Sequence, residues 1–129
     1  MSIKVVTFGE LMLRLTPPDY GRILQSKSFN IYYGGAEANV AASLAQLGIN
    51  AYFVTKVPNN ELGKAAVSYC ASYGINTEYV VYGGERLGIY FCEDGISQRS
   101  SNIIYDRKNS SIATVNSDDF NWDNILKDA

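Results

Sequence analysis

Two residues near position 106 have the chemistry to bind an anionic ligand. Tyr105 and Arg107 are two positions apart, so on a strand their side chains project to the same side. Arginine can hold a carboxylate through two charge-assisted hydrogen bonds, and a phenol adds another donor. Tyr90 lies in the preceding run, on the same face as Gly88, which leaves room for a ligand. A solvent-exposed strand face with ordinary tyrosine pairing fits these residues equally well.

A second candidate is Gly34-Gly35, which directly precedes a helical segment. Glycines allow positive φ and close approach of a ligand to the backbone, and a helix N-terminus offers free N–H groups to oxygen atoms. The alternative is a simple turn followed by alanines for close helix packing. The pattern is not GxGxxG, so it gives no support to a Rossmann nucleotide site. Glu10 follows the first strand, where α/β sheets place ligands, but a surface group is an equal alternative.

The elements that would position these residues follow a βαβ pattern. Strand and helix signals alternate in five segments: 3–8, 36–48, 50–57, 61–73 and 77–82. This order is typical of a parallel sheet with right-handed crossovers. The runs 86–94 and 97–108 depart from it, because Asp94-Gly95 between them predicts a hairpin. The strand before Gly34 could belong with that hairpin.

The first helix carries an apolar stripe of Val40, Leu44 and Leu47, with Ala41 and Ala45 beside it, and a separate polar stripe. Gly48 is a plausible C-cap for this helix, and Asn60 a plausible N-cap for the next. The final segment, 117–129, predicts a cap and one short helix. A sheet that stopped there would expose an edge and an apolar face, so we expect the chain to be part of a larger domain.

Composition excludes several classes of function. The chain has 129 residues, a net charge of −2 and no histidine, so it favours neither a nucleic-acid surface nor a His-based catalytic or metal site. Cys70 and Cys92 show no metal spacing and predict buried free thiols, as expected in a reducing cytosol. No run has the length of a membrane span, and the N-terminus does not resemble a signal peptide. We therefore expect a cytoplasmic protein without nucleic-acid or membrane partners.

The motifs, taken in order, resemble the PfkB, or ribokinase-like, family of carbohydrate kinases. YYGGAEANVAASLAQLG at 32–48, followed by KVPNNELG at 56–63, is similar to the first family signature. GELMLRL at 9–15, LGIYF at 87–91 and YDRKNSSIA at 105–113 resemble the 2-keto-3-deoxygluconate kinase branch. The resemblance implies an α/β fold in which a parallel sheet with flanking helices is covered by a small antiparallel β lid, with the sugar between them.

The resemblance also implies domain limits and site residues. Residues 1–129 would be the N-terminal portion of one ribokinase-like domain that is incomplete at its C-terminus. Its core would comprise about 3–9, 36–84 and 113–129, and its lid about 10–35 and 85–112. Glu37 favours the ketodeoxygluconate branch, whereas Pro58 departs from the strict signature. The residues implied to bind the substrate are Gly34, Gly35, Asn39, Tyr90, Tyr105 and Arg107.

The second family signature, a GAGD-like segment that supplies the catalytic base and an anion hole, has no counterpart here. The resemblance therefore implies no catalytic residue, no metal ligand and no cofactor-binding residue in this chain, which we expect to be inactive alone. ATP and Mg²⁺ would serve the complete enzyme.

We expect that enzyme to phosphorylate a sugar acid, with 2-keto-3-deoxygluconate as the leading substrate. A fructokinase-type or other hexose kinase and a non-catalytic module for sugar binding or lid association are the alternatives. Family resemblance also points to a homodimer formed through the lid.

Overall fold

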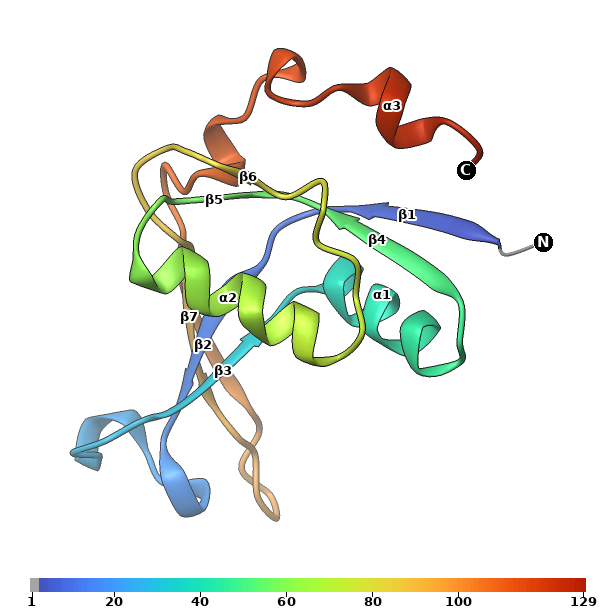
Figure 1. The fold of residues 1–129 in the computed structure, drawn as a ribbon. Helices are drawn as coiled ribbons and strands as arrows, with labels where there is room; N and C mark the ends of the chain where they lie inside the picture. Colours follow the sequence, from blue (N-terminus) through green and yellow to red (C-terminus); the bar gives the residue numbers. More distant parts are fainter. Residues whose placement is uncertain (1–2) are drawn as a thin grey trace.

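The computed structural model describes residues 3–129, which form a core and a sheet that extends from it (Figure 1). The core contains two parallel strand pairs, β1 (Lys4–Phe8) with β4 (Asn50–Val54) and β5 (Lys56–Val57) with β6 (Val81–Tyr82). Its helices are α1 (Ala36–Gln46), α2 (Glu61–Ser72) and α3 (Trp122–Leu126). Short 3-10 helices cover Pro18–Tyr20, Ile23–Gln25, Ile112–Thr114 and Ser117–Asp119. The predicted alternation of parallel strands and helices is confirmed.

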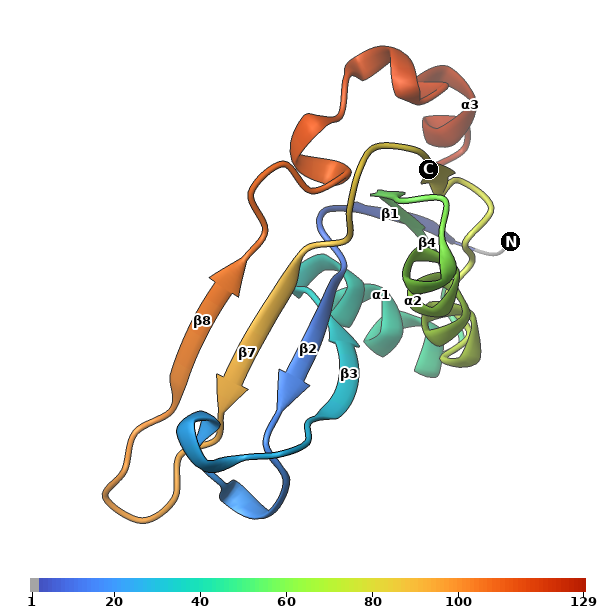
Figure 2. The same ribbon diagram turned by 90° about the vertical axis from the view of Figure 1, so that its left-hand side faces the viewer.

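The extending sheet, here called the lid, has four strands in the order β3-β2-β7-β8 (Figure 2). They are β2 (Met12–Thr16), β3 (Asn30–Gly34), β7 (Ile89–Glu93) and β8 (Asn102–Asp106). The predicted antiparallel hairpin is confirmed as the pair β7–β8, but its tight turn lies at 97–98, between the bridge partners Ile96 and Arg99, and not at Asp94-Gly95. The strand before Gly34 pairs antiparallel with β2. The central pair β2–β7 differs from the expected antiparallel lid because it is parallel. Both central strands leave the core in the same direction, which fixes that orientation.

Helix α1 packs on the core through its small side chains. Ala38 and Ala41 are buried, whereas Val40 is 52% and Leu47 is 77% exposed. The stripe side chains Val40 and Leu47 are therefore not the ones that pack on the core. Alanines let the helix axis approach the sheet closely, and that close approach decides which face is covered. Gly48 takes a φ of 82° immediately after the cap residue Leu47, where a helix C-terminus favours glycine.

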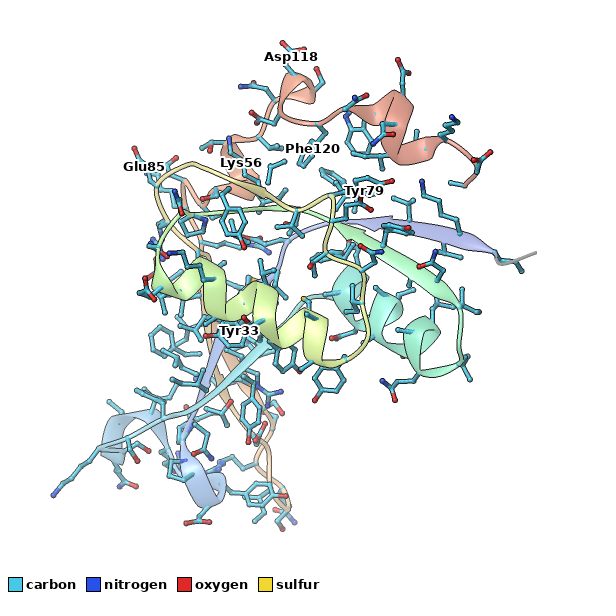
Figure 3. The ribbon with its side chains drawn as sticks, viewed as in Figure 1. Tyr33, Lys56, Tyr79, Glu85, Asp118 and Phe120 are labelled. Atoms are coloured by element: carbon cyan, nitrogen blue, oxygen red, sulfur yellow. The ribbon has the colours of Figure 1, made fainter. Side chains whose placement is uncertain are left out.

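Helix α2 begins and ends as the sequence predicts. The Asn60 side chain accepts a hydrogen bond of 3.0 Å from the Gly63 N–H, which is the N-cap interaction. Gly74 has a φ of 83° after the last turn. Tyr33 of the lid lies against this helix, with its ring centre 5.5 Å from that of Tyr69 (Figure 3).

One main apolar cluster joins the core to the base of the lid. Its buried members are Leu11, Leu13, Ala38, Ala41, Ala51, Phe53, Val57, Ala66, Cys70, Ile75 and Leu87. Leu13 belongs to β2, and Leu15 and Ile89 of the lid strands pack against the same cluster. The lid is thus anchored at its base by the hydrophobic core.

The C-terminal segment covers the other side of the core strands. Phe120 and Ile125 pack with Val54, and Lys56 Nζ lies 3.1 Å from Asp119 Oδ2 (Figure 3). Asp119 also accepts a 2.8 Å hydrogen bond from the Asn116 N–H in a capping box. The predicted cap and short helix are confirmed.

Candidate functional site

The strand register of the lid brings the predicted tyrosines together. Tyr90 on β7 is the direct partner of Tyr105 on β8, and their ring centres are 5.9 Å apart. Gly34 lies at the end of β3, where an added Cβ would be 3.3 Å from the Tyr90 hydroxyl. Tyr90 therefore reaches across β2 toward the glycine, and these three residues occupy one face of the lid.

Arg107 joins this group just beyond the end of β8. Its guanidinium carbon lies 4.6 Å from the centre of the Tyr105 ring, a cation–π contact that confirms the predicted shared side. Arg107 Nη1 lies 3.5 Å from Glu10 Oε1, and the arginine side chain remains 53% exposed. A planar cation with free N–H donors beside two phenols suits the carboxylate of a small ligand.

Gly35 is placed differently from the prediction. Its φ of 173° is extended backbone that any residue adopts, so no conformational requirement selects glycine. An added Cβ would instead collide with the carbonyl oxygen of Glu10 and lie 3.2 Å from the Glu10 carbonyl carbon. The protein's own backbone therefore requires this glycine, whether or not a ligand also approaches it.

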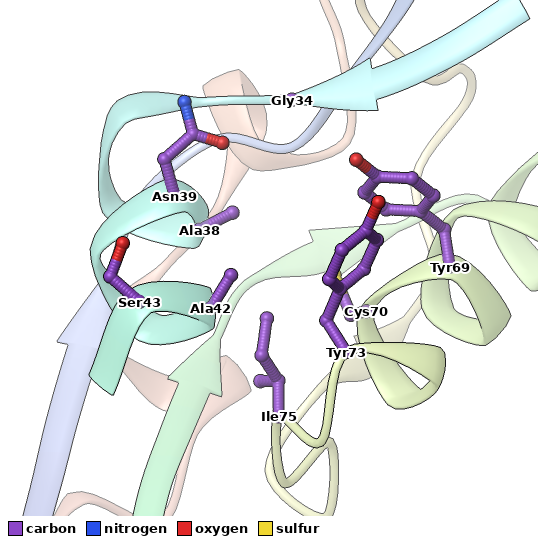
Figure 4. Close-up of a pocket in the computed structure, with 9 residues that line it drawn as sticks. All are labelled: Gly34, Ala38, Asn39, Ala42, Ser43, Tyr69, Cys70, Tyr73 and Ile75. Carbon is purple, nitrogen blue, oxygen red and sulfur yellow. The ribbon is translucent and has the colours of Figure 1, made fainter. Parts of the chain in front are cut away.

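Asn39 lies apart from Tyr105 and Arg107, on the exposed side of α1. It borders a cavity of about 250 Å³ between α1 and α2 (Figure 4). The residues around the cavity are Gly34, Ala38, Asn39, Ala42, Ser43, Tyr69, Cys70, Tyr73 and Ile75. Gly34 borders this cavity and also contacts the Tyr90 side of the lid. The structure thus divides the predicted residues between two adjacent regions that meet at Gly34.

Two further residues contact this group, Arg14 on the tyrosine face and Ser110 at the Glu10 partner of Arg107, and the sequence patterns did not single them out. Arg14 on β2 is the register partner of Tyr90, and its Nη2 lies 3.0 Å from Asp94 Oδ1. Ser110 donates a 2.9 Å hydrogen bond to Glu10 Oε2. The strand alternation could have placed Arg14 on this face, whereas Ser110 lies in a segment with no periodic signal.

Comparison with known proteins identifies the family. The profile of the pfkB family carbohydrate kinases matches residues 2–128. The chain belongs to the pfkB family of carbohydrate kinases.

Two family members illustrate this similarity. The chain is 36% identical to 2-dehydro-3-deoxygalactonokinase of Haloferax volcanii, over all of its own length and 40% of that protein. The crystal structure of 2-dehydro-3-deoxygluconokinase from Thermotoga maritima is 57% identical, with a TM-score of 0.97 over 98% of this chain and 39% of that one. The pfkB chain described here therefore spans about 40% of the length of these relatives.

A similar structure is that of an uncharacterized sugar kinase from Pyrococcus horikoshii, which has been solved in complex with ATP. It is 25% identical, with a TM-score of 0.85 over 97% of this chain and 40% of that one. Among residues 3–129 of the present chain, no three His, Cys, Asp or Glu side chains are grouped to hold a metal ion.

Tyr90 and Tyr69 are held in their neutral, hydrogen-bond-donating form by a raised pKa. Burial raises the pKa of Tyr90, and the nearby Arg14 guanidinium opposes part of that rise. Burial and the neighbouring Tyr73 raise the pKa of Tyr69 to about 12. Protonated phenols donate to carboxylate, carbonyl or hydroxyl oxygens, which are the acceptors that a sugar acid carries. In the same cavity, burial raises the pKa of the Cys70 thiol to about 11, so the thiolate is scarce at neutral pH.

The described part of the chain, residues 3–129, also contains no helix with the length and apolar character needed to cross a membrane.

Proposed function

We propose that this chain forms the lid and half of the sugar site of a sugar-acid kinase. In the complete protein, the γ-phosphoryl group of ATP would be transferred to a hydroxyl of the acceptor. The proposed acceptor is 2-keto-3-deoxygluconate, also called 2-dehydro-3-deoxygluconate. The names of the similar kinases from Thermotoga maritima and Haloferax volcanii, both directed at deoxy keto sugar acids, support this assignment.

The observation that carries the proposal is the arginine on the tyrosine face of the lid. Arg107 stacks on Tyr105, and Tyr105 is paired with Tyr90, so the exposed Arg107 guanidinium and two phenols lie on one surface. The carboxylate of the acceptor would bind Arg107, and its keto or hydroxyl oxygens would accept from the phenols. Gly34 and Asn39 would border the remainder of the sugar, with Gly34 leaving space in front of Tyr90.

The lid residues would contribute by holding the acceptor in place. In phosphoryl transfer a protein acts mainly by positioning the reactants and stabilising charge. Fixing one end of the acceptor through its carboxylate orients the hydroxyl at the other end. The nucleotide and Mg²⁺ would supply the phosphoryl group and neutralise its charge in the complete enzyme.

The proposal can be tested by substituting Arg107 in the full-length gene product. Arg107→Ala should weaken binding of 2-keto-3-deoxygluconate by about 10- to 100-fold, since a hydrogen bond to a charged group contributes about 1.5–3 kcal/mol. ATP affinity should not change. Calorimetric titration measures both, and Lys108→Ala is the matched control, because it removes an exposed positive charge next in sequence.

The same titrations also distinguish a sugar-acid kinase from a hexose kinase and from a non-catalytic module. A hexose kinase would bind neutral fructose as tightly as the sugar acid, and Arg107→Ala would leave both affinities unchanged. A non-catalytic module would bind the acid without phosphorylating it when ATP and Mg²⁺ are added to the full-length gene product.

We further propose that the opposite face of the lid pairs with a second copy of the protein. Ile31, Leu15, Phe91 and Ile104 are successive register partners and form an apolar row across all four lid strands. Ile31 is 61% and Ile104 is 48% exposed. An uncharged apolar row on a protruding sheet is self-complementary, as a two-fold interface requires.

A further inference from the structure

Glu10 is enclosed by three segments that are far from it in sequence. Its Oε2 accepts a 2.9 Å hydrogen bond from Ser110, and a Cβ added at Gly88 would lie 2.5 Å from the same oxygen. Its backbone carbonyl lies against Gly35, where an added Cβ would collide with it. The Glu10 side chain is only 18% exposed. Two glycines thus leave space for this one residue, and the fold holds its carboxylate in a fixed place.

The second carboxylate oxygen of Glu10 faces the arginine of the proposed sugar-acid site. Oε1 lies 3.5 Å from Arg107 Nη1. A guanidinium has five N–H donors in one plane, so a single contact with Glu10 leaves the others for a ligand. The Tyr105 ring covers one face of the same group. Glu10 and Tyr105 together restrict the Arg107 side chain, which otherwise extends into solvent.

We propose that Glu10 is a positioning residue that holds Arg107 in the orientation that receives the carboxylate of the acceptor. This inference rests on the proposed function, because it assumes that Arg107 binds that carboxylate. A free arginine loses much rotamer freedom when it binds, whereas an arginine already held in place loses less. Glu10 also repels a ligand carboxylate, but the arginine lies between the two charges and water screens them.

A double-mutant cycle in the full-length gene product tests this role. Glu10→Gln retains the size of the side chain and an acceptor for Ser110 but removes the charge that faces Arg107. We expect it to weaken binding of 2-keto-3-deoxygluconate by about five-fold, the upper range for a partly exposed ion pair. In the Arg107→Ala background the same substitution should change affinity by less than about two-fold, because the group it positions is gone.

Two controls distinguish positioning from direct contact and from general destabilisation. Affinity for 3-deoxyfructose, which has a hydroxymethyl group in place of the carboxylate, should not change in Glu10→Gln. Glu85→Gln, at an exposed position (Figure 3), should leave both affinities at the parent values. Calorimetry gives these dissociation constants without requiring turnover.

Unchanged or tighter sugar-acid binding by Glu10→Gln would overturn the inference, as would an equal loss with and without Arg107. If Glu10→Gln melts far below the parent, Ser110→Ala replaces it, since that change loosens Glu10 without altering its charge. Ser110→Ala should weaken acid binding by about two-fold, and parent-like binding would again overturn the role of Glu10. If Arg107→Ala itself binds the acid normally, the proposed function fails instead.

Discussion

Replacing Gly35 with alanine should destabilise the protein even though its backbone conformation suits any residue. An added Cβ would collide with the carbonyl oxygen of Glu10 and would lie 3.2 Å from the Glu10 carbonyl carbon and 3.7 Å from Leu11 Cα. These atoms are backbone, so no side-chain rotation relieves the clash. Leu11 is buried in the main core cluster, and moving its backbone would disturb that packing.

The expected cost follows from this geometry. Overpacking a well-packed site costs about 1–3 kcal/mol, and a clash with backbone belongs at the upper end. For a chain of 129 residues, 1 kcal/mol corresponds to about 4 °C in melting temperature. We therefore expect Gly35→Ala to melt about 12 °C below the parent when unfolding is followed by circular dichroism.

Gly34→Ala is the matched control. Its added Cβ would be 3.3 Å from the Tyr90 hydroxyl, the end of a side chain that can move by a few tenths of an ångström. It should melt within about 4 °C of the parent, since such a contact costs less than about 1 kcal/mol. If Gly35→Ala were as stable as Gly34→Ala, the conclusion that Glu10 dictates glycine at position 35 would be wrong.

Two further predictions concern the lid surface and the C-terminal segment. Ile104→Asp should convert the proposed lid dimer to a monomer in sedimentation velocity. Ile103→Asp should not, because Ile103 is equally exposed at 48% but lies on the tyrosine face. A parent protein that sediments as a monomer would contradict the lid dimer. The Asn116 N–H and the Lys56 ammonium lower the pKa of Asp119 below its usual value of 3.8. A lowered carboxyl pKa contributes stability that is present at neutral pH and is lost as pH falls below about 4. As pH is lowered below about 4, the melting temperature of Asp119→Asn should therefore fall less steeply than that of the parent. Parallel curves of melting temperature against pH would refute the contribution of Asp119.

Local signals were sufficient for most of the secondary structure. They predicted a hairpin with Tyr90 and Tyr105 on adjacent strands, but a turn at Asp94-Gly95 would have paired Tyr90 with Arg99, and the structure instead turns at 97–98 and pairs the two tyrosines. Asn60 could be identified as a cap from its position before a helical run, because capping involves only neighbouring residues. Family motifs extended these signals to a fold and a class of activity.

Longer-range packing decided what the sequence patterns left open or predicted incorrectly. Val40 and Leu47 of the apolar stripe of α1 remain exposed, because the alanine face fits closer to the sheet. The parallel arrangement of β2 and β7 depends on where both strands leave the core.

The surroundings of Glu10 show what the sequence determines and what depends on tertiary structure. The sequence by itself determined that a carboxylate follows the first strand, that two glycines precede α1 and that Tyr105 and Arg107 share a side. Only the tertiary structure brought Ser110, Gly88 and Gly35 around that carboxylate. Periodicity and caps act over one or two turns of chain, whereas these contacts join segments up to 100 residues apart and form only when the core and lid pack together.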